Sequence, residues 1–219
     1  MRKLVVGTFV TLDGVMQAPG GPDEDRESGF QHGGWLVPFF DEKFGQIMTE
    51  WTKQASAFLL GRKTYDMFAV SWPKSTDPAD EIAAALNSQP KFVASRTLRK
   101  LDWNNSHLLN GDVAEEITKL KEQGSGEIQV HGSGDLVQTL LKHDLVDSLR
   151  IWQFPVVIGI GKRLFGEGVI PASFRLMETQ QTATGAVLHV YERAGQLKYG
   201  EVEVGQAIVV FDNESASSA

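Results

Sequence analysis

The sequence predicts an α/β fold with a mostly parallel central sheet, flanking helices and an antiparallel C-terminal edge. Strand-like and helix-like segments alternate from residue 4 to residue 157, which is the pattern of successive strand–helix units. Residues 174–192 instead contain two strand-like runs around Thr184-Gly185, which is typical of a hairpin at a sheet edge. The 219 residues contain no repeat, and their number suffices for one large domain. We expect one domain over 1–194 and a tail over 195–219, disordered from 214 to 219.

The first part of the chain begins with a buried strand and a long loop. Residues 4–12 are apolar and β-branched, whereas residues 17–34 are rich in Gly, Pro and acidic side chains. A helix is predicted next, because apolar residues recur on one helical face: Phe40, Phe44, Ile47, Met48, Trp51 and Ala55. Residues 57–60 predict a short buried strand, and residues 62–68 predict the start of another helix.

The second part continues the alternation. Asp77 and Pro78 predict the cap and first residue of a helix that ends near Leu86. Asp112 and Glu115 have capping-box spacing and predict another helix start. The strands predicted around and after these helices cover residues 91–95, 106–109, 127–131, 149–157, 174–183 and 186–192, and a further helix carries Leu136, Val137, Leu140 and Leu141.

The composition excludes several classes of function. With 21 Lys+Arg against 28 Asp+Glu, the net charge of −7 argues against nucleic acid as a partner, because phosphate binding needs a basic face. The absence of Cys excludes disulfides, thiolate metal sites and thiol nucleophiles. No apolar run reaches the roughly 18 residues of a membrane span, and the N-terminus lacks signal-peptide features, so a cytoplasmic protein is expected.

Three predicted strands end in residues that suit a bound phosphate, and ligands of open α/β sheets bind at such ends. Gly61-Arg62-Lys63-Thr64 offers helix-start amides, cations and a hydroxyl. Ser95-Arg96 offers a hydroxyl and a guanidinium that suit an adenosine 2′-phosphate. Gly132-Ser133-Gly134-Asp135-Leu136 lets the backbone approach a pyrophosphate at a helix start. Each segment also fits a plain structural role, as a solvated basic turn, a surface arginine or a tight strand–helix turn.

Other patterns point to no chemistry. The five His residues are dispersed, so no metal site is expected. Gly159-Ile160-Gly161-Lys162-Arg163 resembles the end of a phosphate-binding P-loop, but Val156 stands where the first glycine is required.

Taken in order, six segments resemble the dihydrofolate reductase-like superfamily, and most closely the RibD C-terminal family. That family comprises the reductase domain of the bifunctional riboflavin-biosynthesis deaminase/reductase and its stand-alone bacterial members. The resemblance covers roughly residues 3–193. It is carried by Thr11-Leu12-Asp13-Gly14, Gly61-Arg62-Lys63-Thr64-Tyr65, Val93-Ala94-Ser95-Arg96, His131-Gly132-Ser133-Gly134, Leu145-Val146-Asp147-Ser148-Leu149-Arg150 and the run from Pro155 to Phe165.

The resemblance implies a homodimeric fold that binds NADPH and transfers hydride to a small-molecule substrate. It places Gly61–Thr64 along the cofactor phosphates, Ser95 and Arg96 at the 2′-phosphate, and Gly132–Leu136 at the pyrophosphate. It places Asp13 near the nicotinamide and the substrate. We also expect residues 17–34 to close over the site as a lid, and residues 195–205 to cover either a neighbouring subunit or the chain's own edge.

Two features depart from the related enzymes. Dihydrofolate reductases carry a catalytic carboxylate in a Trp-x-x-Pro-x-Asp pattern, but here Asp41 comes one residue late after Trp35 and Pro38. One residue turns a helical side chain by about 100°, so Asp41 is either the catalytic carboxylate or a helix-start residue. The zinc deaminase signature of the bifunctional enzyme requires Cys, which this chain lacks.

The resulting hypothesis is an NADPH-dependent reductase of a small heterocyclic or ribosylaminopyrimidine-type substrate, with Asp13 and Asp41 as candidate catalytic residues. A dihydrofolate reductase proper is the first alternative. The second is a nucleotide-binding dimeric protein without turnover.

Overall fold

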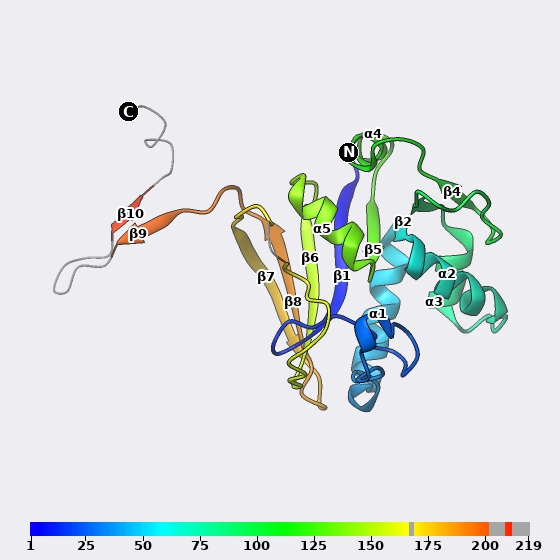
Figure 1. Cartoon of the computed structure of the whole chain (residues 1–219), viewed down its shortest axis with the longest axis horizontal. Coiled ribbons are helices and arrows are strands. Elements are labelled where there is room, and N and C mark those ends of the chain that lie inside the picture. The colour runs from blue at the N-terminus through cyan, green and yellow to red at the C-terminus, as the bar shows by residue number, and fades with distance from the viewer. Residues whose placement is uncertain (167–168, 202–208, 212–219) are drawn as a thin grey trace.

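An eight-stranded mixed sheet runs through the molecule, in the strand order β4-β3-β2-β5-β1-β6-β8-β7 (Figure 1). The computed structural model describes residues 1–166, 169–201 and 209–211. The strands of the sheet are β1 (Lys3–Thr11), β2 (Ala55–Gly61), β3 (Lys91–Ala94), β4 (Ser106–Leu108), β5 (Glu127–His131), β6 (Ser148–Phe154), β7 (Phe174–Gln181) and β8 (Val187–Arg193). The helices are α1 (Glu42–Gln54), α2 (Arg62–Ser71), α3 (Glu81–Ser88), α4 (Val113–Glu122) and α5 (Gly134–Lys142), with short 3-10 turns η1 (Glu27–Gly29), η2 (Val37–Phe39) and η3 (Trp72–Lys74).

The six strands from β4 to β6 are parallel, and the last two are antiparallel. Strand β1 lies between β5 and β6 and pairs in parallel with both. Strand β8 pairs antiparallel with β6 and with β7, which forms one edge of the sheet. The predicted fold class, a mostly parallel sheet with an antiparallel C-terminal edge, is therefore confirmed.

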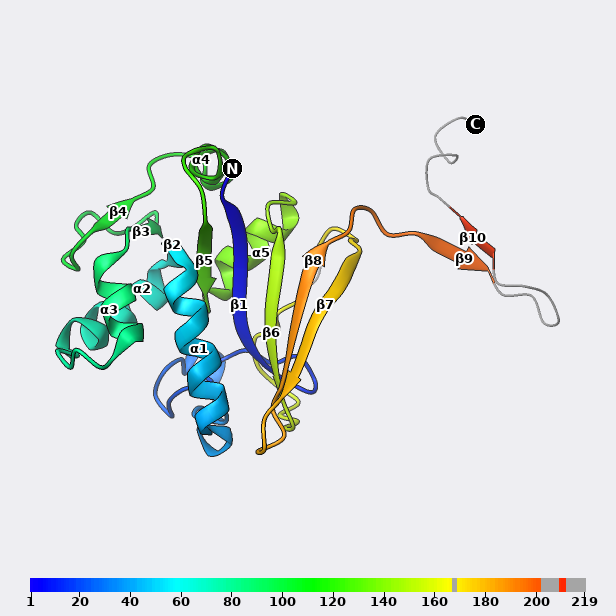
Figure 2. The same cartoon turned by 180° about the vertical axis from the view of Figure 1, so that it is seen from behind.

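Helices cover both faces of the parallel part of the sheet. Helices α4 and α5 contribute Ile117 and Leu140 to a core with Leu4, Val6 and Val130 of the strands. Helix α1 lies on the opposite face, where its apolar stripe packs on β6 and β8 (Figure 2). That stripe, Phe44, Ile47 and Trp51, belongs to the residues whose helical spacing predicted α1. Because helices cover both faces of the sheet, a ligand site is expected at the carboxyl ends of the parallel strands.

Some predicted boundaries need correction. Phe40 lies before α1 rather than within it, since its backbone is extended at φ −63° and ψ 127°. The N-cap of α3 is Asp80 rather than Asp77, because Asp80 Oδ1 accepts from Ala83 N at 2.9 Å while Asp77 closes the preceding turn at Ala79. Ala55 belongs to β2 rather than to α1, since its backbone is extended at φ −64° and ψ 129°. The predicted cap Asp112 is confirmed, and its Oδ1 accepts from Ala114 N and Glu115 N.

The chain continues past β8 as an extension. Strands β9 (Tyr199–Glu201) and β10 (Val209–Phe211) pair antiparallel with each other, and both views show them apart from the main sheet (Figures 1 and 2). The disorder predicted for residues 214–219 lies outside the described residues. No helix among the described residues has the length and hydropathy needed to cross a membrane.

Candidate active site

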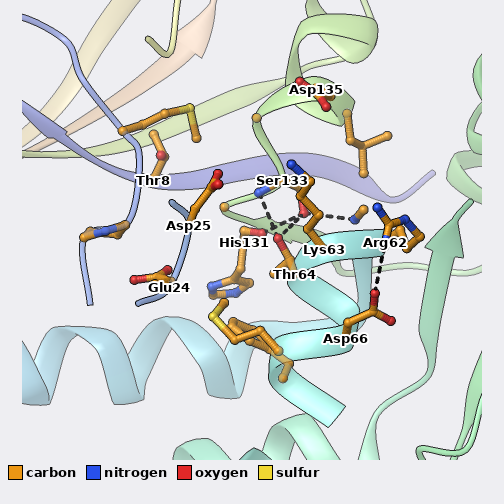
Figure 3. A pocket seen from close by; sticks show the side chains of 18 of the residues that line it. Thr8, Glu24, Asp25, Arg62, Lys63, Thr64, Asp66, His131, Ser133 and Asp135 are labelled. Atoms are coloured by element: carbon orange, nitrogen blue, oxygen red, sulfur yellow. Dashed lines mark hydrogen bonds and ion pairs between the residues drawn. The ribbon is translucent and has the colours of Figure 1, made fainter. Parts of the chain in front are cut away.

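A cavity of about 1620 Å³ opens at the carboxyl ends of β3, β2, β5 and β1 (Figure 3). Because these strands are parallel neighbours, the turns that follow them meet at one edge of the sheet. All of the sequence-predicted cofactor-binding residues line the cavity: Gly61, Arg62, Lys63, Thr64, Ser95, Arg96, Gly132, Ser133, Gly134, Asp135 and Leu136. Three segments far apart in the chain are thus brought into one site.

The turns after β2 and β5 are hydrogen-bonded to each other. Ser133 Oγ accepts from Gly61 N at 2.9 Å, and Ser133 N donates to Thr64 Oγ1 at 3.2 Å (Figure 3). Gly132 has φ +56°, a conformation that glycine adopts without the strain of a Cβ, and Ser133 follows at φ +58°. The two helix starts are therefore held side by side in a fixed arrangement.

Both helix starts keep their first-turn amides free of side-chain caps. Gly61 is the N-cap of α2 and Ser133 is the N-cap of α5, and neither makes a capping side-chain hydrogen bond. Uncapped N–H groups and the positive end of the helix dipole attract anions. Arg62 and Lys63 add positive charge in the first turn of α2. Two adjacent helix starts with this chemistry can hold the two phosphates of a dinucleotide.

The turn after β3 presents a cation to the same cavity. Ser95 Oγ accepts from Thr97 N at 3.2 Å and Leu98 N at 3.0 Å, so it shapes the turn. Arg96 is exposed and forms no ion pair within the described part of the chain, whereas Arg62 is paired with Asp66 at 3.1 Å. Arg96 is therefore available to an anionic ligand without first losing a partner.

The loop of residues 17–34, which we call the acidic loop, is tied across the cavity by ion pairs. Lys162 contacts Asp25 at 2.6 Å and also Glu27, and Glu27 contacts Lys63 of α2 as well. Hydrogen bonds from Lys162 and Lys63 lower the pKa of Glu27 to about 2. Burial lowers the pKa of Lys162, but its bonds to Asp25 and Glu27 outweigh burial and raise it overall. Solvent-exposed ion pairs contribute little each because water and salt screen them, so these contacts can break and form again.

Helix α1 gives the cavity an apolar wall without a carboxylate. Its lining residues are Phe44, Gly45, Met48 and Thr52, and Thr52 Oγ1 is already bonded to Met48 O at 2.7 Å. A Cβ added at Gly45 would meet no atom within 4 Å, so the space beside this part of the helix is open. A pterin held through a carboxylate on this helix finds no such group among the lining residues.

The two sequence-predicted catalytic carboxylates bind backbone groups, and neither lines the cavity. Asp13 accepts from Thr11 Oγ1 at 2.6 Å, from Ile158 N at 3.2 Å and from Gly159 N at 2.8 Å. The Thr11 bond, opposed by burial and helped by the two amides, lowers the pKa of Asp13 to about 2. Asp13 therefore joins the end of β1 to the loop after β6.

Asp41 serves the start of α1. Its Oδ1 accepts from Phe44 N at 2.8 Å as the N-cap, and its Oδ2 accepts from Ala183 N at 3.1 Å in the β7–β8 turn. Of the two roles that the sequence left open for Asp41, the structure supports the helix-start role. The catalytic assignments of Asp13 and Asp41 stay predictions without support from this geometry.

Sequence reasoning did not single out His131, Asp25 or Lys162 as site residues, although all three line the cavity. His131 is the last residue of β5, and Figure 3 shows its ring pointing into the cavity. Its position directly before Gly132 was the signal available in the sequence. Within the described ranges, no three His, Asp or Glu side chains lie close enough to hold a metal ion, and the expectation of no metal stays a prediction.

Fold and site together define a class: α/β proteins of the dihydrofolate reductase-like fold, with a ligand cavity at the carboxyl ends of the parallel strands. Residues 2–188 match the model of the RibD C-terminal domain. The chain belongs to the RibD C-terminal domain family.

Two known proteins resemble the chain over most of its length. The chain is 30% identical over 196 residues to the uncharacterized protein YyaP of Bacillus subtilis (strain 168), covering 89% of this chain and 96% of that protein. A putative riboflavin biosynthesis protein from Shewanella sp. PV-4 has a TM-score of 0.61 at 24% identity, over 88% of this chain and 99% of that one.

A bifunctional protein has the same fold. The diaminohydroxyphosphoribosylaminopyrimidine deaminase/5-amino-6-(5-phosphoribosylamino)uracil reductase from Thermotoga maritima has a TM-score of 0.58 at 14% identity. The match covers 88% of this chain and 57% of that longer chain. At these identities, the solved structures show the fold alone.

Proposed function

We propose that the protein is an NADPH-dependent reductase of the riboflavin-pathway type. It would transfer a hydride to a small heterocyclic or ribosylaminopyrimidine substrate, as a 5-amino-6-(5-phosphoribosylamino)uracil reductase does. The observation that carries the proposal is the pair of uncapped helix starts, α2 and α5, beside Arg96 in one cavity. This set provides separate positions for a pyrophosphate and for a 2′-phosphate.

The chain's own residues would bind and orient the reactants, while bound NADPH would supply the hydride. The first turns of α2 and α5 would hold the pyrophosphate, and Ser95 and Arg96 the 2′-phosphate. The apolar wall of α1, with Phe44 and Met48, would receive the substrate ring. The acidic loop would open for entry by releasing its weak ion pairs, and close to exclude water.

The alternatives differ in what they require. A dihydrofolate reductase proper needs a carboxylate facing the cavity from α1, and the residues of α1 that line it include none. A nucleotide-binding protein without turnover would bind NADPH equally well but oxidise none of it against pyrimidine and pteridine substrates.

Binding of NADPH tests the proposal directly. Titration should quench tryptophan fluorescence, since Trp72 lines the cavity. Replacing Arg96→Gln should weaken NADPH binding by roughly 10- to 100-fold, because a charge-assisted hydrogen bond contributes about 1.5–3 kcal/mol. The same replacement should leave NADH binding unchanged, because NADH has no 2′-phosphate. The matched control is Arg99→Gln, since Arg99 is exposed and lies outside the cavity lining. Absence of quenching at millimolar NADPH would refute the proposal.

We also propose that the protein acts in the cytoplasm as a homodimer. The edge strand β7 exposes Leu176 and Met177, and apolar side chains on an uncovered strand favour association. The extension that carries β9 lies apart from the chain's own sheet, which supports contact with a neighbouring subunit rather than with its own edge (Figures 1 and 2).

A further inference from the structure

A row of polar side chains leads along one face of β5 to the cavity. Glu127, Gln129 and His131 alternate along the strand and therefore point to the same side. Arg150 of β6 binds Glu127 with both terminal nitrogens, each at 2.8 Å. Gly7 of β1 lies between His131 and Arg150 in the sheet register, and its missing side chain keeps the face between them open.

The amide of Gln129 has one orientation that satisfies its neighbours. Its Nε2 donates to Trp51 O at 2.6 Å and to Glu127 Oε2 at 3.0 Å. The opposite orientation would set the amide oxygen against these two acceptors, which is repulsive. Gln129 Oε1 is therefore the atom that faces His131 Nε2, at 3.2 Å.

This arrangement fixes the tautomer of His131. An amide oxygen only accepts, so the imidazole proton must lie on Nε2. Burial, followed by the charge of Arg150, lowers the pKa of His131 to about 4, so the ring is neutral at physiological pH. Glu127 lies two residues further along the row and bonds Gln129. The other charged side chains that line the cavity are Asp23, Glu24, Asp25, Arg26, Arg62, Lys63, Asp66, Arg96, Asp112, Asp135 and Lys162. Nδ1 consequently carries a lone pair, and no hydrogen bond to it is formed within the described part of the chain.

We propose that Nδ1 of His131 accepts a hydrogen bond from a ring N–H of the substrate and so selects heterocycles of the lactam type. This inference names the substrate class and rests on the proposed reductase function for the hydride step. The neutral ring has no proton on Nδ1 to give, so His131 acts in recognition and not as a general acid. An N-methylated ring would leave the Nδ1 lone pair without a donor and would place a methyl group against it, which weakens binding.

The tautomer is measured without any turnover. Nitrogen-15 NMR of the imidazole rings in the full chain should show His131 protonated on Nε2 and neutral down to about pH 5. His107 is the internal control for an imidazole that lies near an amide oxygen but is exposed to solvent. Its Nε2 lies 3.4 Å from Asn105 Oδ1. Protonation on Nδ1, or titration near the unperturbed pKa of about 6.5, would overturn the inference.

Ligand selection is measured with a matched pair, lumazine and 1,3-dimethyllumazine, which differ in their ring N–H groups. In the NADPH-saturated protein, lumazine should shift the Nδ1 resonance of His131 and bind about 10-fold or more tightly than the dimethyl form. Replacing His131→Leu should abolish this preference, while His131→Asn, whose Oδ1 replaces Nδ1, should retain it. Equal binding of both compounds, or no shift at Nδ1, would overturn the inference.

The two proposals fail separately. If NADPH quenches the tryptophans but lumazine leaves Nδ1 unchanged, the reductase proposal stands and the recognition role of His131 falls. If NADPH does not bind, but the Nε2–H tautomer is observed and the protein without NADPH prefers lumazine, the reductase proposal falls and the recognition role of His131 stands.

Discussion

At the scale of single residues, Asp13 shows how a carboxylate at the end of a strand can serve the backbone rather than a substrate. It receives two amide hydrogen bonds from the loop after β6 and one from Thr11, and a side-chain contact from Arg163 at 3.5 Å. These donors favour the ionised form. The pKa of Asp13 in the folded protein, about 2, therefore lies below the unfolded value of about 3.8.

Replacing Asp13→Asn should change the acid sensitivity of the fold. Because the folded pKa is depressed, the carboxylate's contribution is complete above about pH 4 and is lost as the pH falls toward 2. The wild type should therefore be more stable than the variant at pH 7, and this difference should shrink between pH 4 and pH 2. Urea unfolding midpoints across this range measure it, and a difference that is constant with pH would contradict the assignment.

Some residues that line the cavity could be predicted from the sequence, and others could not. Gly61–Thr64, Ser95, Arg96 and Gly132–Leu136 could be predicted because each segment directly follows a predicted strand. Lys162 could not, because its role depends on Asp25, a residue 137 positions away. The position of His131 directly before Gly132 was visible in the sequence, but its tautomer was not, because it depends on how Gln129 is oriented by Trp51, 78 positions away. Contacts between distant segments leave no local pattern in one sequence.

At the scale of elements, the start of α1 decides what Asp41 does. Replacing Asp41→Ala should lower the free energy of unfolding by about 1 kcal/mol, the usual loss for an N-cap. Asp41→Asn should be less destabilised than Asp41→Ala, because Asn still caps the helix, although its amide nitrogen cannot accept the hydrogen bond from Ala183 N. Both variants should keep the wild-type kcat once folded. Thermal unfolding and steady-state kinetics measure these effects, and a large loss of kcat in Asp41→Asn would restore the catalytic role.

The boundaries of some helices could be predicted from neighbouring residues, and those of others could not. Asp112 was predictable as a cap because Glu115 follows it at capping-box spacing and its hydrogen-bond partners lie within three residues. The cap of α3 was not, because Asp77 and Asp80 both fit the local pattern. Ser75 Oγ donates to Asp80 Oδ2 at 2.7 Å and orients its carboxylate, and this contact decides between the two. The parallel pairing of the strands from β4 to β6 agreed with the prediction, because alternating strand–helix units favour parallel pairing.

At the scale of the whole molecule, the proposed homodimer depends on the uncovered edge strand β7. Leu176 is 52% exposed, so Leu176→Arg changes a surface and not a core. In a dimer that buries β7, the variant should become monomeric, with an unchanged circular dichroism spectrum and unfolding midpoint. Light scattering after size exclusion measures the mass, with Lys119→Ala on the remote helix α4 as the control. A wild-type protein that is monomeric at micromolar concentration would contradict the proposal.

Gly45, within α1, lowers the stability of the helix but leaves space in the cavity. Glycine inside a helix costs about 1 kcal/mol relative to alanine, and the space around its Cα would admit a methyl group. Replacing Gly45→Ala would therefore stabilise the helix and reduce the space along this wall of the cavity. Gly45 is therefore the position at which an added side chain, charged or apolar, could change which molecules fit the cavity while leaving the turns after β2, β3 and β5 unchanged.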